Sequence, residues 1–544
     1  MDGILHRRAL PKPIPGIPYN VESSRRRLGD APHLLAIKKS GRRVRQFWYD
    51  LARRHDRPVI QFFMPFSKPC VVVWDFREAQ DLLVRRSKEL DRGWMNNDMW
   101  QGALPHHFIA MDTRDPRFVE AKAVQKDLMT PSFLYSVSAP ASYDKVLHLI
   151  ELWSLKARLA EGRPFEALED LNHFTADVIF AAALGIEDAE SSTVQNMERL
   201  RTIGSINPPT DINSVQLFPE TQPQGLLQSI LKLYWLLTNM RPKNRRAQEL
   251  RKTILQEHID RARVRLSQTD EKEPRLHAAV DYMVSRELSA AEKAGRAPML
   301  NTPLFNDLLF GYCLGGQDTT HSVLSFLVKQ LSGHQETQSQ LRSTLRETYS
   351  AAFSERRNPN QQEITRGQVP FLDAFIYEVL RCDTPSPFII KQTLTDMNVL
   401  GTIIPKGTPL FFPLFGASLD EPAFPIPESA RSETSQKHSS DIPSDWVSGG
   451  YPPHEFHAER WLRTDERGNI IFDQKAGPFL SFGAGVRECW GMRLARLQLK
   501  LATTLLVWNF EFEALPGELV DSEVVDVLNA KPKKCFVRLK KIDL

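Results

Sequence analysis

Apolar residues recur at helical spacing along most of the chain, and short β-rich patches separate these stretches. One example is the stretch 371–382, whose apolar face carries Phe371, Phe375, Ile376, Val379 and Leu380. A longer one opens with Thr302-Pro303, an N-cap residue followed by proline at the first helical position, and ends near Ser332-Gly333. We find no internal repeat. The pattern predicts a mostly helical protein with a smaller amount of β-structure.

Three segments depart from this pattern. Residues 1–40 are rich in Arg and Pro, and closely spaced prolines favour extended chain, so they form a stiff lead-in. Residues 418–452 are polar and Ser-rich, and their composition predicts a mobile surface insertion. The stretch Leu226 to Met240 is amphipathic, which is typical of a buried helix or, less commonly, of one lying on a membrane surface.

The bulk composition excludes several classes of protein. The chain has 544 residues, 42% hydrophobic content and a net charge of only +4, so it can build a large core, and nucleic-acid binding is not indicated. Its five cysteines are widely spaced and include no C-x-x-C pair, which argues against a disulfide framework and fits a reducing, intracellular compartment. No apolar run reaches about 18 residues and no secretory signal opens the chain, so the sequence predicts no transmembrane anchor.

The strongest chemical signal is the stretch Phe482-Gly-Ala-Gly-Val-Arg-Glu-Cys-Trp-Gly491, followed directly by a helical pattern. A glycine-bearing loop thereby delivers Cys489 to a helix start, where exposed amides and the helix dipole should lower the thiol pKa and favour a thiolate, the form that binds a metal. Gly483, Gly485 and Gly491 would let the backbone approach a flat macrocycle, and Arg487 could pair with an acidic group on it. The alternative is a buried structural cysteine in a glycine-rich turn.

A second constellation lies inside the long helical stretch 302–333. Gly311, Gly315 and Gly316 cost about 1 kcal/mol each relative to alanine within a helix, which is unfavourable unless something needs the space. Asp318 and Thr319 follow directly, and an acid and an alcohol beside a gap can accept dioxygen and relay protons to it. A kinked core helix with a hydrogen-bonded threonine is the alternative.

A third pattern is E-x-x-R at Glu378 and Arg381, where the i to i+3 spacing places the two charges side by side. The pattern is weak alone, because it also occurs at Glu89/Arg92, Glu198/Arg201, Glu363/Arg366 and Glu428/Arg431, where most pairs would be solvated. Position distinguishes the pair at 378: it precedes the cysteine loop, and Phe456-His-Ala-Glu-Arg-Trp461 lies between them.

Together the three patterns resemble those of the cytochrome P450 family. The resemblance implies haem b as cofactor, with Cys489 as the axial ligand of the haem iron and Phe482, Gly483, Gly491, Arg487, Gly315 and Gly316 around the haem. It implies that Thr319 supports bound dioxygen and that Asp318 links it to solvent protons. It also implies a structural role for Glu378, Arg381 and Arg460, which would hold the cysteine loop.

The resemblance covers residues 40 to 540, so we expect the cytochrome P450 fold as one large domain, 41–544, mostly α with a smaller β-rich subdomain. Three positions depart from the family. Lys122 and Lys126 stand where the family usually has Trp and Arg, and Lys391 stands where Arg is common. We expect Lys126 and Lys391 to reach the haem propionates as point charges.

The implied reaction is insertion of one oxygen atom from O2 into a small apolar organic substrate. The sequence style is similar to fungal members that make secondary metabolites. The substrate would contact residues within Trp94 to Trp100, Leu308 to Tyr312 and Phe388 to Ile390. A haem-thiolate isomerase or dehydratase, and a haem-binding sensor without catalytic activity, are the alternatives, and neither needs the Asp318-Thr319 pair.

The chain has no nicotinamide or flavin fingerprint, so electrons from NADPH would come through a separate cytochrome P450 reductase. We expect the reductase to dock near the cysteine loop, where the positive charges are Arg487, Arg493 and Arg496. The expected protein is a monomer in the cytoplasm or at the endoplasmic-reticulum surface, with peripheral membrane contact through its basic clusters.

Overall fold

The computed structural model describes residues 10–40, 43–65, 67–203, 238–268, 276–446, 450–520, 523–526 and 529–543. The predicted helix Leu226 to Met240 therefore lies outside the described residues, except for its last three positions. In the part of the chain that is described, none of the helices is both long enough and apolar enough to cross a bilayer.

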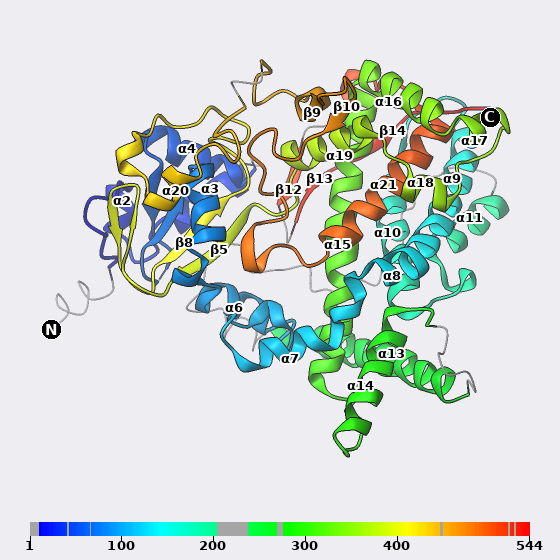
Figure 1. Cartoon of the computed structure of the whole chain (residues 1–544), viewed down its shortest axis with the longest axis horizontal. Coiled ribbons are helices and arrows are strands. Elements are labelled where there is room, and N and C mark those ends of the chain that lie inside the picture. The colour runs from blue at the N-terminus through cyan, green and yellow to red at the C-terminus, as the bar shows by residue number, and fades with distance from the viewer. Residues whose placement is uncertain are drawn as a thin grey trace.

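Helices form most of the molecule and gather on one side of it (Figure 1). The long helices are α9 (Ala139–Ala160), α10 (Leu168–Leu184), α11 (Ser192–Ile203), α13 (Pro242–Ser267), α14 (Ala279–Lys293), α15 (Pro303–Gly333), α16 (Gln335–Thr348), α19 (Pro370–Cys382) and α21 (Met492–Asn509). The shorter ones are α2 (Val21–Ser24), α3 (Ala31–Lys39), α4 (Arg45–His55), α5 (Phe76–Gln80), α6 (Gly93–Gln101), α7 (Pro116–Gln125), α8 (Pro131–Phe133), α17 (Ser350–Ser354), α18 (Gln361–Arg366) and α20 (Glu433–Lys437).

The β-structure is smaller, and its largest sheet lies with the N-terminal helices on the other side (Figure 1). Its main sheet has the order β1-β2-β8-β5-β3, with β2 parallel to β8 and every other pair antiparallel. These strands are β1 (Val59–Phe62), β2 (Cys70–Val73), β3 (Leu90–Asp91), β5 (Phe388–Thr393) and β8 (Pro409–Pro413). The small pairs are β4 (Phe165–Glu166) with β14 (Phe536–Val537), β6 (Met397–Val399) with β7 (Thr402–Ile404), β9 (Leu462–Thr464) with β10 (Ile470–Phe472), β11 (Phe510–Phe512) with β15 (Leu539–Lys541), and β12 (Val524–Asp526) with β13 (Ala530–Pro532).

The central helix of the fold is α15, which crosses the whole helical part of the molecule (Figure 1). Its bounds confirm the prediction from sequence: Thr302 is the N-cap, its hydroxyl accepts from the Phe305 N–H, and Pro303 opens the helix. Most of its residues at 305–314 and 320–332 are buried, and the helix packs against α10, α19 and α21. The fold class predicted from the sequence, mostly α with a smaller β-rich part, is confirmed.

Part of the segment predicted to be a mobile insertion is held by ion pairs, one of which is buried. Arg431 pairs with Asp75, with 2.6 Å between Nη1 and Oδ1, and both side chains are almost fully buried. Glu428 pairs with Arg77 at 2.6 Å, and Ser432 donates to the Asp81 carboxylate at 2.7 Å. Residues 428–437 thereby attach to α5 and to the π-helical turn η1 (Asp81–Arg85) that follows it. The polar composition of this stretch therefore reflects fixed contacts as well as solvent exposure.

Candidate active site

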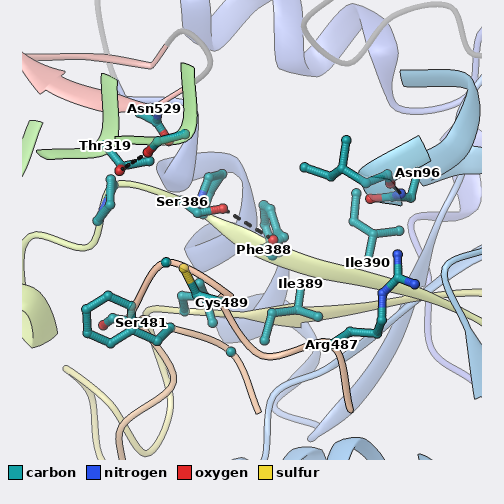
Figure 2. A pocket seen from close by; sticks show the side chains of 18 of the residues that line it. Asn96, Thr319, Ser386, Phe388, Ile389, Ile390, Ser481, Arg487, Cys489 and Asn529 are labelled. Carbon is teal, nitrogen blue, oxygen red and sulfur yellow. Dashed lines mark hydrogen bonds between the residues drawn. The ribbon is translucent and has the colours of Figure 1, made fainter. Parts of the chain in front are cut away.

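A cavity of about 640 Å³ lies between α15, strand β5 of the main sheet and the loop that carries Cys489. Figure 2 shows Cys489 and Arg487 on that loop, Phe388, Ile389 and Ile390 on strand β5, and Thr319 and Asn529 on the wall beyond them. The three patterns found in the sequence thus belong to one region of the molecule, and two of them face the same cavity.

The loop before α21 places Cys489 at the cavity. The Cys489 N–H donates to the Phe482 carbonyl at 2.7 Å, which closes the loop on itself. Gly483 and Gly485 have φ angles of +74° and +71°, a region that favours glycine. A Cβ on Gly485 would lie 2.0 Å from the Leu83 carbonyl oxygen, so this glycine lets the loop pack on η1 and does not line the cavity. The Cys489 side chain lies deep within the protein, and its accessible surface opens onto the cavity.

The thiol pKa differs from the prediction. Burial raises the pKa of Cys489, and the Glu488 carboxylate adds to this effect. The Gly491 N–H and the charges of Lys122 and Arg92 lower the pKa, as expected for a helix start with cations nearby, but they do not compensate for burial. The prediction of a lowered thiol pKa was wrong because it weighed the helix start and not the loss of water around the sulfur.

The glycines of α15 serve three different purposes. A Cβ at Gly315 would meet nothing within 4 Å, so this position opens onto the cavity. A Cβ at Gly316 would lie 2.4 Å from Ile179 Cδ1, so this glycine lets α10 pack on α15. A Cβ at Gly311 would lie 2.4 Å from the His107 ring. The helix is unbroken here, and the Thr319 hydroxyl donates to the Gly315 carbonyl at 2.8 Å.

Asp318 does not line the cavity. Its carboxylate pairs with Lys531 and accepts a hydrogen bond from the Asn529 side chain, both on the β12–β13 side of the helix. Asn529 lines the cavity, so it bridges the carboxylate to the cavity wall. The sequence could not show this arrangement, because Asp318 and Lys531 are far apart along the chain. The adjacent Asp318 and Thr319 therefore differ in their access to the cavity.

Four basic side chains, Arg92, Lys122, Lys391 and Arg487, line one side of the cavity and form what we call the cation cluster. Burial and their mutual repulsion lower their pKa values, to about 9 for Arg92, about 8 for Lys122 and about 7 for Lys391. The pKa of Arg487 falls to about 10 through burial, although Asp91 and Asp112 oppose the fall.

The members of the cation cluster are held by different elements. Arg487 donates from Nη2 to the Phe108 and Met111 carbonyls at 2.9 Å each, so it is turned inward and is not part of a docking surface. Lys391 lies on β5, opposite Leu410 of β8. Lys122, on α7, lies over the Phe108 and Trp490 rings.

Two residues of this region were assigned differently from the sequence. Lys126 is exposed and does not line the cavity, whereas Lys122, one helical turn earlier, does. Arg92 was grouped with Glu89 as a solvated pair, but Glu89 pairs with Arg86 at 2.8 Å and Arg92 faces the cavity. In the sequence, the signal for Arg92 was its position directly after the short strand Leu90–Asp91. That signal is too weak to predict a place in the cavity wall.

Glu378 forms the centre of a buried ionic network. Its carboxylate accepts from Arg381 at 2.7 and 2.8 Å and from Arg460 at 2.8 Å. The His457 N–H and the Trp461 indole N–H donate to it at 2.9 Å. Burial alone would raise the pKa of Glu378, but the charges of Arg381 and Arg460 outweigh it and lower the pKa. Ser481 donates to the Leu380 carbonyl at 2.7 Å and so joins α19 to the cysteine loop.

The donor set fits a haem group. The Cys489 thiol faces the cavity from one wall, and the open position at Gly315 lies on another, formed by α15. The cation cluster makes a third side positively charged. Within the described residues, the Arg92 Nε is buried with no hydrogen-bond partner. A buried, unpaired cationic donor is costly, and the carboxylates of a haem would satisfy it.

The segments predicted to contact substrate reach the cavity in part. Asn96, Met99 and Trp100 line it from α6, Gly311 and Tyr312 from α15, and all of Phe388 to Ile390 from β5. Leu308 and Leu309 are buried in the core instead. The sequence did not single out His107, which lines the cavity from the loop after α6.

Comparison with known proteins decides which family this site represents. The family model described as cytochrome P450 matches residues 32–433 and 451–536. The chain belongs to the cytochrome P450 family. The P450 match omits residues 434–450, which lie inside the predicted insertion 418–452. Membership identifies the chain as a P450 monooxygenase and implies a haem iron and the use of O2.

Several fungal P450 monooxygenases resemble this one, some of them along nearly its full length. Cytochrome P450 monooxygenase TRI13 of Fusarium sporotrichioides is 33% identical, with 99% of this chain and 97% of the relative covered. Cytochrome P450 monooxygenase xilC of Penicillium rubens is 32% identical, with 98% and 94% covered. The Hps1-dma1 cluster cytochrome P450 monooxygenase of Dothistroma septosporum is 34% identical over 49% of this chain and 87% of its own.

Proposed function

We propose that this P450 holds haem b through Cys489 and inserts one oxygen atom from O2 into an apolar small organic substrate, as a step of secondary-metabolite biosynthesis. The observation that carries the proposal is the cavity in which the Cys489 thiol, the open Gly315 position and the cation cluster meet. The fungal relatives support the biosynthetic setting, and one of them is named after a cluster.

The residues in and near the cavity would have different roles in the reaction. Haem bound through a cysteine thiolate supplies the chemistry that activates dioxygen. Cys489 provides the thiolate, and the cation cluster fixes the carboxylates of the cofactor. The Thr319 hydroxyl donates to the Gly315 carbonyl at the cavity wall, so it can instead donate to a group bound in the cavity. Asp318 would supply protons indirectly, because Asn529 stands between its carboxylate and the cavity.

Electrons would come from NADPH through a separate reductase. Of the three arginines predicted to dock it, Arg487 is turned inward and Arg496 is half-buried over the Tyr377 ring, whereas Arg493 is exposed on the first turn of α21. Arg493 is thus the side chain that best supports a docking site beside the cysteine loop.

The setting in the cell is part of the same proposal. We place the enzyme as a monomer inside the cell, with peripheral contact to the endoplasmic-reticulum surface. Support comes from the stretch between the start of α2 and α3, where Val21, Leu28 and Leu35 are exposed and residues 25–27 are exposed arginines.

The haem-thiolate isomerase and the sensor remain the competing functions. Neither of them needs the Asp318-Thr319 pair, but Asp318 does not line the cavity, so the pair alone does not exclude them. Substrate turnover that requires both a reductant and dioxygen would support the monooxygenase over either of them.

The first test is the visible spectrum of the reduced protein with carbon monoxide, in the parent and in Cys489→Ser. We expect a strongly red-shifted Soret band in the parent and its loss in the variant. Cys535→Ser is the matched control, because Cys535 is buried and donates to the Ser325 carbonyl, as a serine also can. A red-shifted band that persists in Cys489→Ser would contradict the proposal.

A further inference from the structure

Most polar side chains on the cavity wall facing the Cys489 loop already donate to protein acceptors. Thr319 donates to the Gly315 carbonyl at 2.8 Å, and Ser386 donates to the Phe388 carbonyl at 3.4 Å. Asn529 donates to Asp318. The rest of this wall is largely apolar, including Met99, Trp100 and Leu314. The Tyr312 and Thr320 hydroxyls have no hydrogen-bond partner among the described residues, but their oxygens are enclosed by protein atoms. A substrate therefore meets few donors that are both free and accessible.

His107 differs from these residues. Its Nδ1 accepts the Ile109 N–H at 3.1 Å, so the ring proton of the neutral imidazole sits on Nε2. Burial lowers the pKa of His107 to about 3, and the nearby charges of Lys122, Arg92 and Arg487 add to this effect, so the ring stays neutral. Among the described residues, Nε2 has no hydrogen-bond partner, and it is not one of the fully enclosed polar atoms, so it opens onto the cavity that the ring lines.

The imidazole reaches the cavity because Gly311 leaves room for it. A Cβ at Gly311 would lie 2.4 Å from His107 Cδ2 and 2.5 Å from Nε2. Any other residue at this position would push the ring away from α15. The glycine at 311 was noticed in the sequence as an unfavourable helix residue, and this contact accounts for it.

The backbone around His107 is held from three sides. The Asp307 carboxylate accepts the His106 N–H at 2.9 Å, and Arg251 pairs with Asp307 at 3.6 Å. Arg251 also donates to the Ala103 carbonyl at 3.1 Å. On the other side, the Asn96 amide donates to the Ile109 carbonyl at 2.9 Å. The Nε2–H group of the His107 ring is therefore fixed in position before a substrate binds.

We propose that His107 is a specificity-determining residue, whose Nε2–H binds an oxygen acceptor (a carbonyl, ether or hydroxyl oxygen) on an otherwise apolar substrate. The proposal rests on the monooxygenase function proposed above and adds the substrate class. A site with a buried donor discriminates against ligands that lack the acceptor, because the donor is then left unpaired. The site therefore binds an oxygenated substrate more tightly than a pure hydrocarbon of the same shape.

The donor also orients the substrate along α15. Gly311 precedes Gly315 by four residues, which is roughly 6 Å along a helix axis. The acceptor oxygen is thereby held one helical turn from the open position where we place dioxygen. The oxidised carbon is accordingly distinct from the carbon that carries the acceptor.

The test uses the haem-loaded protein and two probes of equal shape, adamantanone and methyleneadamantane, which differ in a carbonyl oxygen against a CH2 group. Binding is measured by calorimetry, independently of turnover. We expect the parent to bind the ketone about 3- to 10-fold more tightly, the range of one neutral hydrogen bond.

Two variants distinguish loss of the Nε2–H donor from loss of the hydrogen bond between the His107 side chain and the Ile109 N–H. In His107→Gln the side-chain amide can donate from the Nε2 position, and in His107→Asn the carbonyl can still accept the Ile109 N–H while the donor to the cavity is lost. We expect the ketone preference to remain in His107→Gln and to disappear in His107→Asn. A preference that is absent in the parent, or unchanged in His107→Asn, overturns the proposal.

The carbon monoxide spectrum, recorded on the same preparations, distinguishes the two levels of failure. A normal red-shifted band without any ketone preference rejects the role of His107 and leaves the monooxygenase standing. In a second outcome, His107→Asn loses haem, and the fraction that retains haem still prefers the ketone. This result would mean that the donor binds the cofactor, and it rejects the role of His107 in substrate binding. Absence of the red-shifted band in the parent rejects both.

Discussion

Buried positive charge is the feature of individual residues that explains most about the cavity. Arg92, Lys122, Lys391 and Arg487 are crowded together with lowered pKa values, which is unfavourable for the protein alone. Groups of this kind are common at binding sites, where the ligand supplies the missing charge. The sequence could predict Arg487 and Lys391 from motif positions, but not Arg92, because the turn that aims its side chain depends on the sheet beside it.

The assignment within α7 can be tested with two neighbouring lysines. Lys122→Met should weaken haem retention about 10-fold or more, because it removes a charged partner of a carboxylate. Lys126→Met should leave haem retention unchanged, since Lys126 is exposed and does not line the cavity. Haem loss to an acceptor protein measures both rates. Equal loss in the two variants would contradict the assignment.

Individual helices were the most predictable part of this protein. The bounds of α15 and α19 follow from Thr302-Pro303, from the periodic apolar face and from the E-x-x-R pair, because these signals are local. The purpose of each glycine in α15 was not predictable, because it depends on which element packs against it. Gly315 meets nothing, Gly316 meets Ile179 of α10, and Gly311 meets His107 of a distant loop.

Two adjacent alanine substitutions test this division. Gly316→Ala should lower the free energy of unfolding by about 1–3 kcal/mol, because its Cβ would lie 2.4 Å from Ile179 Cδ1. Gly315→Ala should be neutral or stabilising by up to about 1 kcal/mol, because alanine favours the helix and meets no neighbour. Chemical denaturation measures both. Ile179→Ala should restore part of the stability of Gly316→Ala, and no rescue would argue against this contact.

The whole molecule brings the cysteine loop, α21 and η1 together at one surface. Gly485 packs on Leu83 of η1, and η1 in turn holds the polar segment 428–437 through Asp81. The sequence suggested a docking surface for a reductase here from three arginines, and their burial leaves Arg493 as the exposed one. Side-chain direction at this level depends on tertiary packing, so a count of charges along the sequence overstates the surface.

The docking surface is tested by reversing one charge. Arg493→Glu should slow reduction by the reductase about 3- to 10-fold at low salt and weaken the salt dependence, because steering by charge is screened. Arg246→Glu, on the exposed face of α13, is the control and should behave like the parent. Stopped-flow reduction in the presence of carbon monoxide measures the rate. Equal rates for Arg493→Glu and the parent would remove Arg493 from the interface.

The walls of the cavity come from positions between Leu34 and Asn529, and strand β14 returns to pair with β4 near residue 165. A ribosome releases the chain from its N-terminus, so the early helices emerge long before the cysteine loop and the last strands. The cavity can close only when the chain as far as Asn529 has left the ribosome. Uptake of the cofactor therefore follows the synthesis of this last part of the wall, and a product terminated before it would have an incomplete site.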